Sequence, residues 1–154
     1  MNDTLASLIP RLAEQRVLVI GDVILDEYVY GSATRMSREA PVPVLEFTER
    51  RFIAGGAANP AANIAALGST ALLMSVTGSD SAAQQLKRVL EPAGIETGAL
   101  VSDSTRPTTV KTRIMAQMGL RFPQQVARID TLSRQPIDRK TERRLLTMLD
   151  AHIG

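Results

Sequence analysis

The chain has 154 residues, of which 44% are hydrophobic and 22% are charged, a size and composition typical of one globular domain. It contains no Cys and a single His, which excludes a disulfide framework and a metal motif rich in His or Cys. Fifteen of its eighteen basic residues are Arg, but the formal net charge is only +2 and aromatic residues make up 3%. Because the basic residues are not interleaved with aromatic ones, we expect no nucleic-acid partner.

No apolar run in the sequence reaches the roughly 20 residues that a membrane-spanning helix needs. The first residues, Met1 to Thr4, also lack the basic start of a signal peptide. We therefore expect no membrane partner and a cytoplasmic location. The sequence shows neither an internal repeat nor a low-complexity segment, and it is long enough for one domain with its own core.

Three apolar runs are typical of buried strands. They are rich in Val, Leu, Ile and Ala and cover residues 17–21, 71–76 and 99–102. Such continuous runs are typical of parallel strands that are covered on both faces. Between them, the patterns predict helices over residues 59–67 and 81–91. This alternation indicates an α/β fold, in which a right-handed parallel sheet has flanking helices.

The ends of the predicted helices carry recognisable signals. Gly68 closes the first helix, and Asp80 is placed to cap the second one. Near the start of the chain, leucines at helical spacing and an internal proline predict a kinked helix over residues 4–14. Near its end, a helix is predicted over residues 139–152, and Asp138 can cap it.

A second, smaller sheet is predicted from segments in which polar and apolar residues alternate. Residues 26–31 and 41–49 are expected to be strands, and residues 32–41 a polar loop between them. Residues 108–115 and 124–130 are expected to form a hairpin that joins the same sheet. We expect a small antiparallel sheet, inserted after the first core strand.

Two adjacent glycines, Gly55 and Gly56, precede the helix predicted over residues 59–67. Glycine tolerates positive φ and lets a ligand approach the backbone, and a helix start offers free N–H groups with a partial positive charge. Asn59 at this start can either cap the helix or turn its amide to a ligand hydroxyl. On these residues alone, a strand-to-helix turn that binds nothing is the commoner interpretation.

Further polar side chains are expected where strands end, which is where parallel sheets gather their functional groups. An Asp and an Asn that face one pocket can bind several hydroxyls of a sugar. Each residue also has a purely structural alternative, as a strand end, a helix cap or a solvated strand residue. The residues concerned are Asp22, Asp26, Asn59, Lys111, Arg113 and Asp130.

Common nucleotide-binding and catalytic motifs are absent from the sequence. It contains no G-x-x-x-x-G-K-[ST] phosphate loop, no G-x-G-x-x-G dinucleotide fingerprint and no G-x-S-x-G nucleophile elbow. A nucleotide-binding oxidoreductase is therefore the least favoured of the functions considered.

Several segments together resemble the ribokinase-like (PfkB) carbohydrate kinases. Residues 19–26 (VIGDVILD) are similar to the opening motif of that family, and residues 55–59 (GGAAN) with residues 63–68 are similar to its first signature. The resemblance covers about residues 16–150. Three further segments resemble one branch in particular: residues 35–44, 107–113 and 124–130. That branch contains the heptose 7-phosphate kinases and the kinase half of the bifunctional heptose kinase/adenylyltransferase.

The resemblance implies a parallel α/β domain with a small β-sheet lid, formed by segments about 26–53 and 107–130. It implies that the γ-phosphoryl group of ATP is transferred, with Mg²⁺, to the anomeric hydroxyl of a heptose 7-phosphate. Such a reaction serves the synthesis of ADP-heptose, a precursor of lipopolysaccharide or glycans. The implied partner of this chain is therefore a sugar phosphate.

The matching motifs also imply site residues. Asp26 and Asn59 would hold sugar hydroxyls, and Gly55 and Gly56 would allow the sugar to come close. A carboxylate suits this role because it accepts two hydroxyl hydrogen bonds, and Arg suits phosphate because its fork matches the phosphate oxygens. The basic candidates for contact with the sugar or its 7-phosphate are Lys111, Arg113 and Arg35.

The family's second signature, a Gly-Ala-Gly-Asp turn, has no counterpart in these 154 residues. In the family, that turn supplies the catalytic Asp and an anion-binding helix start. We therefore expect the N-terminal part of a kinase domain, incomplete on the C-terminal side of its sheet, with no catalytic base among its residues. We expect such a chain not to turn over ATP alone and to bind ATP and Mg²⁺ poorly.

The competing interpretation is a non-catalytic module for sugar binding or dimerisation, derived from such a kinase. Lids of ribokinase-like proteins often form dimer contacts, so a homodimer through the lid is a further expectation. An incomplete sheet exposes a strand edge and apolar helix faces. We therefore expect marginal stability or association.

Overall fold

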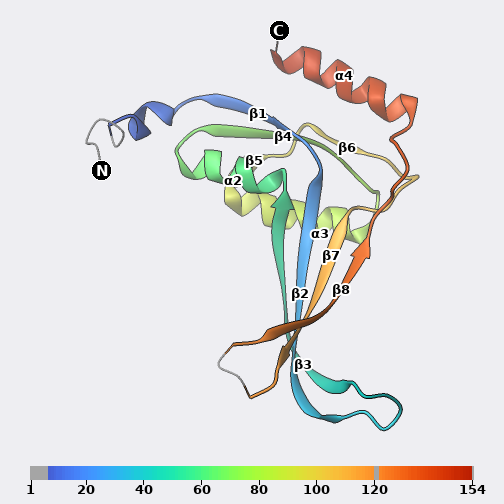
Figure 1. Ribbon diagram of the computed structural model, residues 1–154. Helices are drawn as coiled ribbons and strands as arrows, with labels where there is room; N and C mark the ends of the chain where they lie inside the picture. The colour runs from blue at the N-terminus through green and yellow to red at the C-terminus, as the bar shows by residue number, and fades with distance from the viewer. Residues whose placement is uncertain (1–6, 120–121, 154) are drawn as a thin grey trace.

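The computed structural model describes residues 7–119 and 122–153. Within these residues the chain forms two four-stranded sheets, and Figure 1 shows the narrow sheet projecting from the layered body that contains the other. The strands are β1 (Arg16–Ile20), β2 (Val23–Met36), β3 (Pro43–Gly56), β4 (Thr70–Thr77), β5 (Ile95–Glu96), β6 (Leu100–Ser102), β7 (Val110–Gln117) and β8 (Gln124–Thr131). The helices are η1 (Ile9–Leu12), α2 (Ala58–Ala66), α3 (Ser81–Leu90), η2 (Glu91–Ala93) and α4 (Arg139–Ile153).

The sheet of the body is parallel, as the three apolar runs predict. Its order is β1-β4-β5, and β6 pairs with the carboxyl-terminal half of β4. Strand β4 is central and is almost entirely buried. The short strand β5 was not predicted, because two residues are too few for a recognisable pattern.

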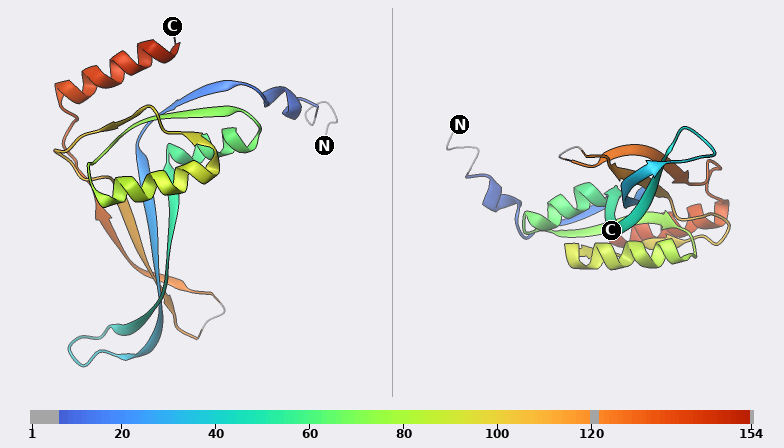
Figure 2. Two further views of the ribbon diagram at one scale, coloured as in Figure 1. Left: turned by 180° about the vertical axis from the view of Figure 1, so that it is seen from behind. Right: turned by 90° about the horizontal axis from the view of Figure 1, so that it is seen from below.

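Helices cover both faces of this sheet. Helices α2 and α3 lie on one face and α4 lies on the other, as Figures 1 and 2 show. The face under α2 and α3 forms the main core around Leu73, Leu86 and Leu90. On the opposite face, Met74 belongs to a smaller cluster against which Leu145 of α4 packs. The α/β class with flanking helices is confirmed.

The projecting sheet has the order β3-β2-β7-β8. Strands β2 and β3 pair antiparallel, as do β7 and β8, but β7 runs parallel to β2. The prediction of a purely antiparallel sheet is therefore wrong. Strands β2 and β7 are parallel because both leave the body at the carboxyl-terminal edge of its sheet and run outward in the same direction. We call this projecting sheet the lid.

The lid hairpin β2–β3 is much longer than its sequence suggested. Each strand has 14 residues, and the segment from Ser32 to Met36, predicted to be a loop, continues β2. The pairing absorbs two irregularities, one after Tyr30 and one after Ala33. Side chains on this part of the sheet are mostly polar or partly exposed on both faces, so no apolar alternation marks the strand.

Most helix ends follow the predicted signals. Asp80 caps α3 by accepting from Ala83 N at 2.9 Å, and Asp138 caps α4 by accepting from Thr141 N at 2.6 Å. The predicted helix over residues 4–14 is only the short η1, with Pro10 at its start; residues 1–6 lie outside the described part. None of the described helices is long and apolar enough to cross a bilayer.

Candidate functional site

The glycine pair closes strand β3 against the start of β2. Gly55 pairs with Ile24, and a Cβ atom at position 55 would overlap Oδ2 of Asp26. Gly56 has a φ of +60°, and a Cβ there would overlap the backbone oxygen of Asp22. Both positions therefore need glycine, the first for a close approach and the second for its backbone conformation as well.

The carboxylate of Asp26 is held in an ion pair on the lid. Arg113 Nη1 donates to Asp26 Oδ1, and the guanidinium lies 5.2 Å from the ring centroid of Tyr28. The side chains are 21% exposed for Arg113 and 18% for Asp26, so the pair is shielded from water. The hydrogen bond to Asp26 raises the pKa of Arg113 above its usual value, so the guanidinium stays charged.

A second cation and a second carboxylate share this face of the lid. Lys111 of β7 stands beside Asp26 of β2, and Asp130 of β8 stands on the other side of Lys111. Asp130 is paired with Arg128 at 2.8 Å. In the part of the chain that the structure describes, no acidic group lies within ion-pair distance of Lys111. The lid face thus joins an acceptor, Asp26, to two cations.

Asn59 lies in the first turn of α2, directly after the glycine pair. The N-cap of this helix is Ala57, and no side chain caps it. The alternative in which Asn59 caps the helix is therefore not realised. Its side chain is exposed, and its helix starts where Ala57 N donates to Asp22 O at 2.9 Å. Asn59 is thus placed at the same end of β2 as Asp26.

Arg35 is separated from the other predicted site residues. It pairs with Val44 near the far tip of the lid hairpin. Nine positions of β2 separate it from Asp26, which at the usual rise of a strand is about 30 Å. The structure therefore brings together Asp26, Gly55, Gly56, Lys111 and Arg113, with Asn59 at the adjoining helix start, and leaves Arg35 apart.

A cavity of about 330 Å³ lies at the carboxyl ends of β1 and β4. Ile24 and Thr109, each two positions before a lid-face residue, line it, so the cavity adjoins the Asp26 site. Besides Thr109, the polar residues in its wall are Asp22, Ser75, Arg106 and Ser133. Of these, the sequence indicated only Asp22.

No pattern in the sequence indicated that Ser75, Arg106 and Ser133 line a cavity. Ser75 sits inside an apolar strand, where its Oγ accepts from Val23 N at 3.0 Å. Arg106 and Ser133 belong to connecting segments. Their place next to the cavity depends on where the lid strands enter and leave the body, which no local pattern records.

The start of β7 is fixed to the body by Asp80. Thr108 donates to this carboxylate from its backbone N at 2.9 Å and from its Oγ1 at 2.7 Å. Gly78 N donates in turn to Thr108 Oγ1 at 2.9 Å. Burial alone would raise the pKa of Asp80, but the hydrogen bonds from Thr108 and Ala83 outweigh it and lower that pKa. Asp80 therefore anchors the strand that carries Lys111 and Arg113.

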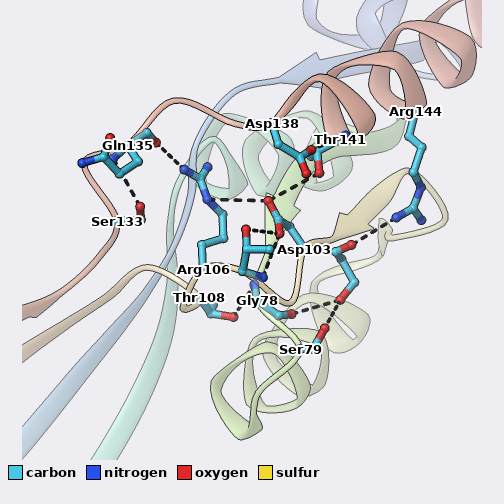
Figure 3. Close-up of polar contacts among 12 residues, drawn as sticks. Gly78, Ser79, Asp103, Arg106, Thr108, Ser133, Gln135, Asp138, Thr141 and Arg144 are labelled. Carbon is cyan, nitrogen blue, oxygen red and sulfur yellow. Dashed lines mark hydrogen bonds and ion pairs between the residues drawn. The ribbon is translucent and has the colours of Figure 1, made fainter.

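A neighbouring polar cluster ties α4 to the same edge, as Figure 3 shows. Asp103 accepts from Thr105 N at 2.9 Å and from Thr105 Oγ1 at 2.7 Å, which lowers the pKa of its carboxyl. Arg106 Nε lies 3.9 Å from Asp103 Oδ2, and Arg106 Nη2 donates to Gln135 O. Thr141 Oγ1 completes the cluster at 3.4 Å from Asp103 Oδ2. These contacts hold the segment between β8 and α4 against the body.

A family model described as the pfkB family carbohydrate kinase matches residues 14–122. The chain therefore belongs to the pfkB family of carbohydrate kinases. Its curated relatives include a D-beta-D-heptose 7-phosphate kinase and bifunctional proteins named HldE, which confirms the resemblance that the lid segments indicated.

Three of these relatives illustrate the degree of sequence similarity. The chain is 44% identical over 139 residues to the bifunctional protein HldE of Azorhizobium caulinodans, covering 90% of this chain and 28% of that protein. It is 44% identical over 120 residues to the D-beta-D-heptose 7-phosphate kinase of Bordetella bronchiseptica, covering 78% and 36%. It is 47% identical over 121 residues to the HldE of Pseudomonas aeruginosa LESB58, covering 79% and 24%. The chain thus spans about a quarter to a third of the length of these relatives.

Solved structures support the fold assignment. A carbohydrate kinase from Agrobacterium tumefaciens superposes with a TM-score of 0.58 at 20% identity, over 75% of this chain and 35% of that one. An Arabidopsis thaliana ribokinase, solved with ribose and ATP, superposes with a TM-score of 0.55 at 18% identity, over 79% and 36%. At these identities the likeness concerns the fold, and it confirms a ribokinase-like architecture.

Proposed function

We propose that this chain forms the sugar-binding side and the lid of an ATP-dependent kinase that phosphorylates the anomeric hydroxyl of a heptose 7-phosphate. The observation that carries the proposal is the Asp26 carboxylate, which lies over Gly55 and beside Lys111 and Arg113 on the lid. A carboxylate next to cations suits a ligand with both hydroxyls and a phosphate. The names of the relatives favour heptose 7-phosphate over other sugar phosphates.

Each site residue has a distinct role in this proposal. Asp26 accepts hydrogen bonds from sugar hydroxyls, and the Asn59 amide binds a further hydroxyl from the start of α2. Because Gly55 and Gly56 have no side chains, the sugar ring can come close to the backbone. Lys111 and Arg113 bind the 7-phosphate, so the ring is held at both ends. Arg35, at the lid tip, takes no part within the same chain.

The nucleotide side of the reaction lies outside these residues in our proposal. ATP supplies the phosphoryl group and Mg²⁺ neutralises its charge during transfer. In residues 7–119 and 122–153 there is no cluster of three or more His, Cys, Asp or Glu that could hold a metal, and the sequence has no phosphate loop. We propose that this chain contributes sugar binding, and that the product of the complete enzyme feeds ADP-heptose synthesis in the cytoplasm.

A dimerisation or sugar-binding module without catalysis is the second candidate. It is favoured by apolar side chains on the lid that are more than half exposed, among them Phe47 and Ile129. Exposed apolar area of this kind often marks an interface. A homodimer through the lid is compatible with either function. Sugar binding is tested first, because its absence would leave only a dimerisation module.

The test is a calorimetric titration of the 154-residue chain with heptose 7-phosphate. We expect binding, and we expect Asp26→Ala to weaken it by about tenfold or more, since a hydrogen bond to a charged group contributes about 1.5–3 kcal/mol. Asp150→Ala, at an exposed position of α4, is the matched control and should bind as the wild type does. Equal affinity of the Asp26 variant and the control would show that the sugar binds elsewhere.

ADP release in the presence of heptose 7-phosphate, ATP and Mg²⁺ separates the parts of the proposal. We expect no sugar-dependent release from the chain alone, because transfer needs both substrates in line. Sugar-dependent release well above a control without protein would mean that a residue of this chain acts as the base, and the division proposed here would be wrong.

A further inference from the structure

One oxygen of the Asp26 carboxylate is taken by Arg113, and the other lies against Gly55. Oδ1 accepts from Arg113 Nη1, and Oδ2 lies so close to Gly55 that a Cβ there would overlap it. A carboxylate has about two acceptor positions on each oxygen, and Arg113 takes one of those on Oδ1 and neutralises much of the negative charge. A sugar hydroxyl that uses Oδ1 therefore competes with the guanidinium of Arg113 for the charge of the same carboxylate.

The guanidinium of Arg113 has a second partner besides Asp26. The ring of Tyr28 lies under it, with 5.2 Å between the guanidinium carbon and the ring centroid. The side chain can thus turn away from Asp26 and keep its cation–π contact. Because Tyr28 is two positions from Asp26 on the same face of β2, such a turn carries the guanidinium along the lid face, away from the glycine pair.

A phosphate group can replace the Asp26 carboxylate as the negatively charged partner of Arg113. Its oxygens match the guanidinium fork, and charge-assisted bonds of this kind are strong. Lys111, on the same strand and two positions away, brings a second cation to the same place. A sugar without a phosphate offers only hydroxyls, and these do not replace the carboxylate as the counterion of Arg113.

We propose that Arg113 makes the site select phosphorylated sugars, because it occupies the Asp26 carboxylate until a phosphate group on the sugar draws its guanidinium away. The proposal rests on the proposed function, since it concerns the same sugar site. A sugar phosphate binds to Arg113 and to the released Asp26 together. An unphosphorylated sugar must break the ion pair without compensation, so it binds weakly.

The test compares heptose 7-phosphate with unphosphorylated heptose on the 154-residue chain. Arg113→Gln removes the charge and keeps a polar chain of similar length. We expect it to weaken heptose 7-phosphate by about tenfold or more and to leave heptose bound at least as tightly as by the wild type. Arg51→Gln is the matched control, because Arg51 also lies over a tyrosine, Tyr30, at 5.3 Å, but pairs with Glu49 at 2.7 Å. The control should keep the wild-type preference for the phosphorylated sugar.

A second variant tests the same competition without any sugar. Asp26→Asn removes the charge that holds Arg113, so inorganic phosphate should bind several-fold more tightly than it does to the wild type. The signal of Arg113 Nε–Hε in NMR spectra, assigned by its loss in Arg113→Gln, should move on addition of phosphate. Circular dichroism spectra establish that each variant is folded.

The outcomes separate the two proposals. A parallel loss of both sugars in Arg113→Gln, or phosphate affinity that does not rise in Asp26→Asn, would overturn the role of Arg113 in selection. If the wild type bound neither sugar, the proposed function would fail, and the phosphate titration would still decide whether Asp26 competes for Arg113.

Discussion

The carboxylate of Asp26 lies directly over the Cα of Gly55, so close that any side chain at position 55 would displace it. A Cβ there would overlap Oδ2 and would lie 3.2 Å from Asp26 Cγ. The two residues come from adjacent strands of the lid, and their contact sets the direction in which the carboxylate points. Gly55 is therefore a site residue through Asp26, as well as a residue that allows the ligand to approach.

Gly55→Ala tests this relationship. We expect the new methyl group to push the carboxylate out of position and to weaken heptose 7-phosphate by about tenfold, comparable with the loss of one hydrogen bond to a charged group. Gly98→Ala is the matched control, because a Cβ at that position has nothing within 4 Å. Calorimetric titration gives the comparison. Unchanged sugar affinity in Gly55→Ala would show that the position of Asp26 does not matter for binding.

The stability of the chain should depend on pH through Asp80. Its hydrogen bonds from Thr108 and Ala83 lower its pKa in the folded state, below the usual value of about 3.9 for an unfolded chain. A depressed folded pKa means that the carboxylate stabilises the fold above about pH 4 and that this stabilisation is lost as the pH falls through the folded pKa. Asp103 and Asp138, whose pKa values are also lowered by hydrogen bonds, act in the same direction.

Asp80→Asn isolates the contribution of that carboxylate. We expect the variant to be less stable than the wild type by about 1 kcal/mol at pH 7, and the difference to shrink as the pH falls below about 4. Urea unfolding at several pH values measures both. Asp150→Asn, at an exposed site, should follow the wild-type curve. A difference that stays constant with pH would mean that the charge of Asp80 is not what stabilises the fold.

The fold class could be predicted from sequence because the body obeys local rules. Strand β4 is a continuous apolar run and is buried along its length, and Asp80 and Gly68 mark helix ends where the structure has them. Parallel order followed from the alternation of strands and helices. These features depend on residues close together in the chain.

The lid and the cavity could be predicted only in part, because their features depend on distant contacts. The continuation of β2 to Met36 is stabilised by pairing with β3 rather than by its own pattern. The pair between Asp26 and Arg113 joins residues 87 positions apart; the sequence indicated both residues but not their contact. Arg35 is the reverse case, because its motif lies near Asp26 in sequence while strand β2 carries it toward the lid tip.

Exposed apolar surface should make the chain associate. Phe47 on the lid is 65% exposed and Ile153 on α4 is 67% exposed, and β1 pairs only with β4 among the described strands. We expect the weight-average mass in sedimentation equilibrium to rise with concentration. Phe47→Lys should reduce the association if it runs through the lid, and Ile153→Lys if it runs through the body. A mass that stays monomeric at all concentrations would contradict the expectation.

The most direct test of the proposed site is a crystal structure of the chain with heptose 7-phosphate bound. We expect sugar hydroxyls within hydrogen-bond distance of Asp26 and Asn59, the ring beside the Asp26 carboxylate and near Gly56, and the phosphate against Lys111 and Arg113, with the guanidinium of Arg113 turned away from Asp26. A sugar bound at another place, with the ion pair between Arg113 and Asp26 intact, would contradict both the site and the selection by Arg113.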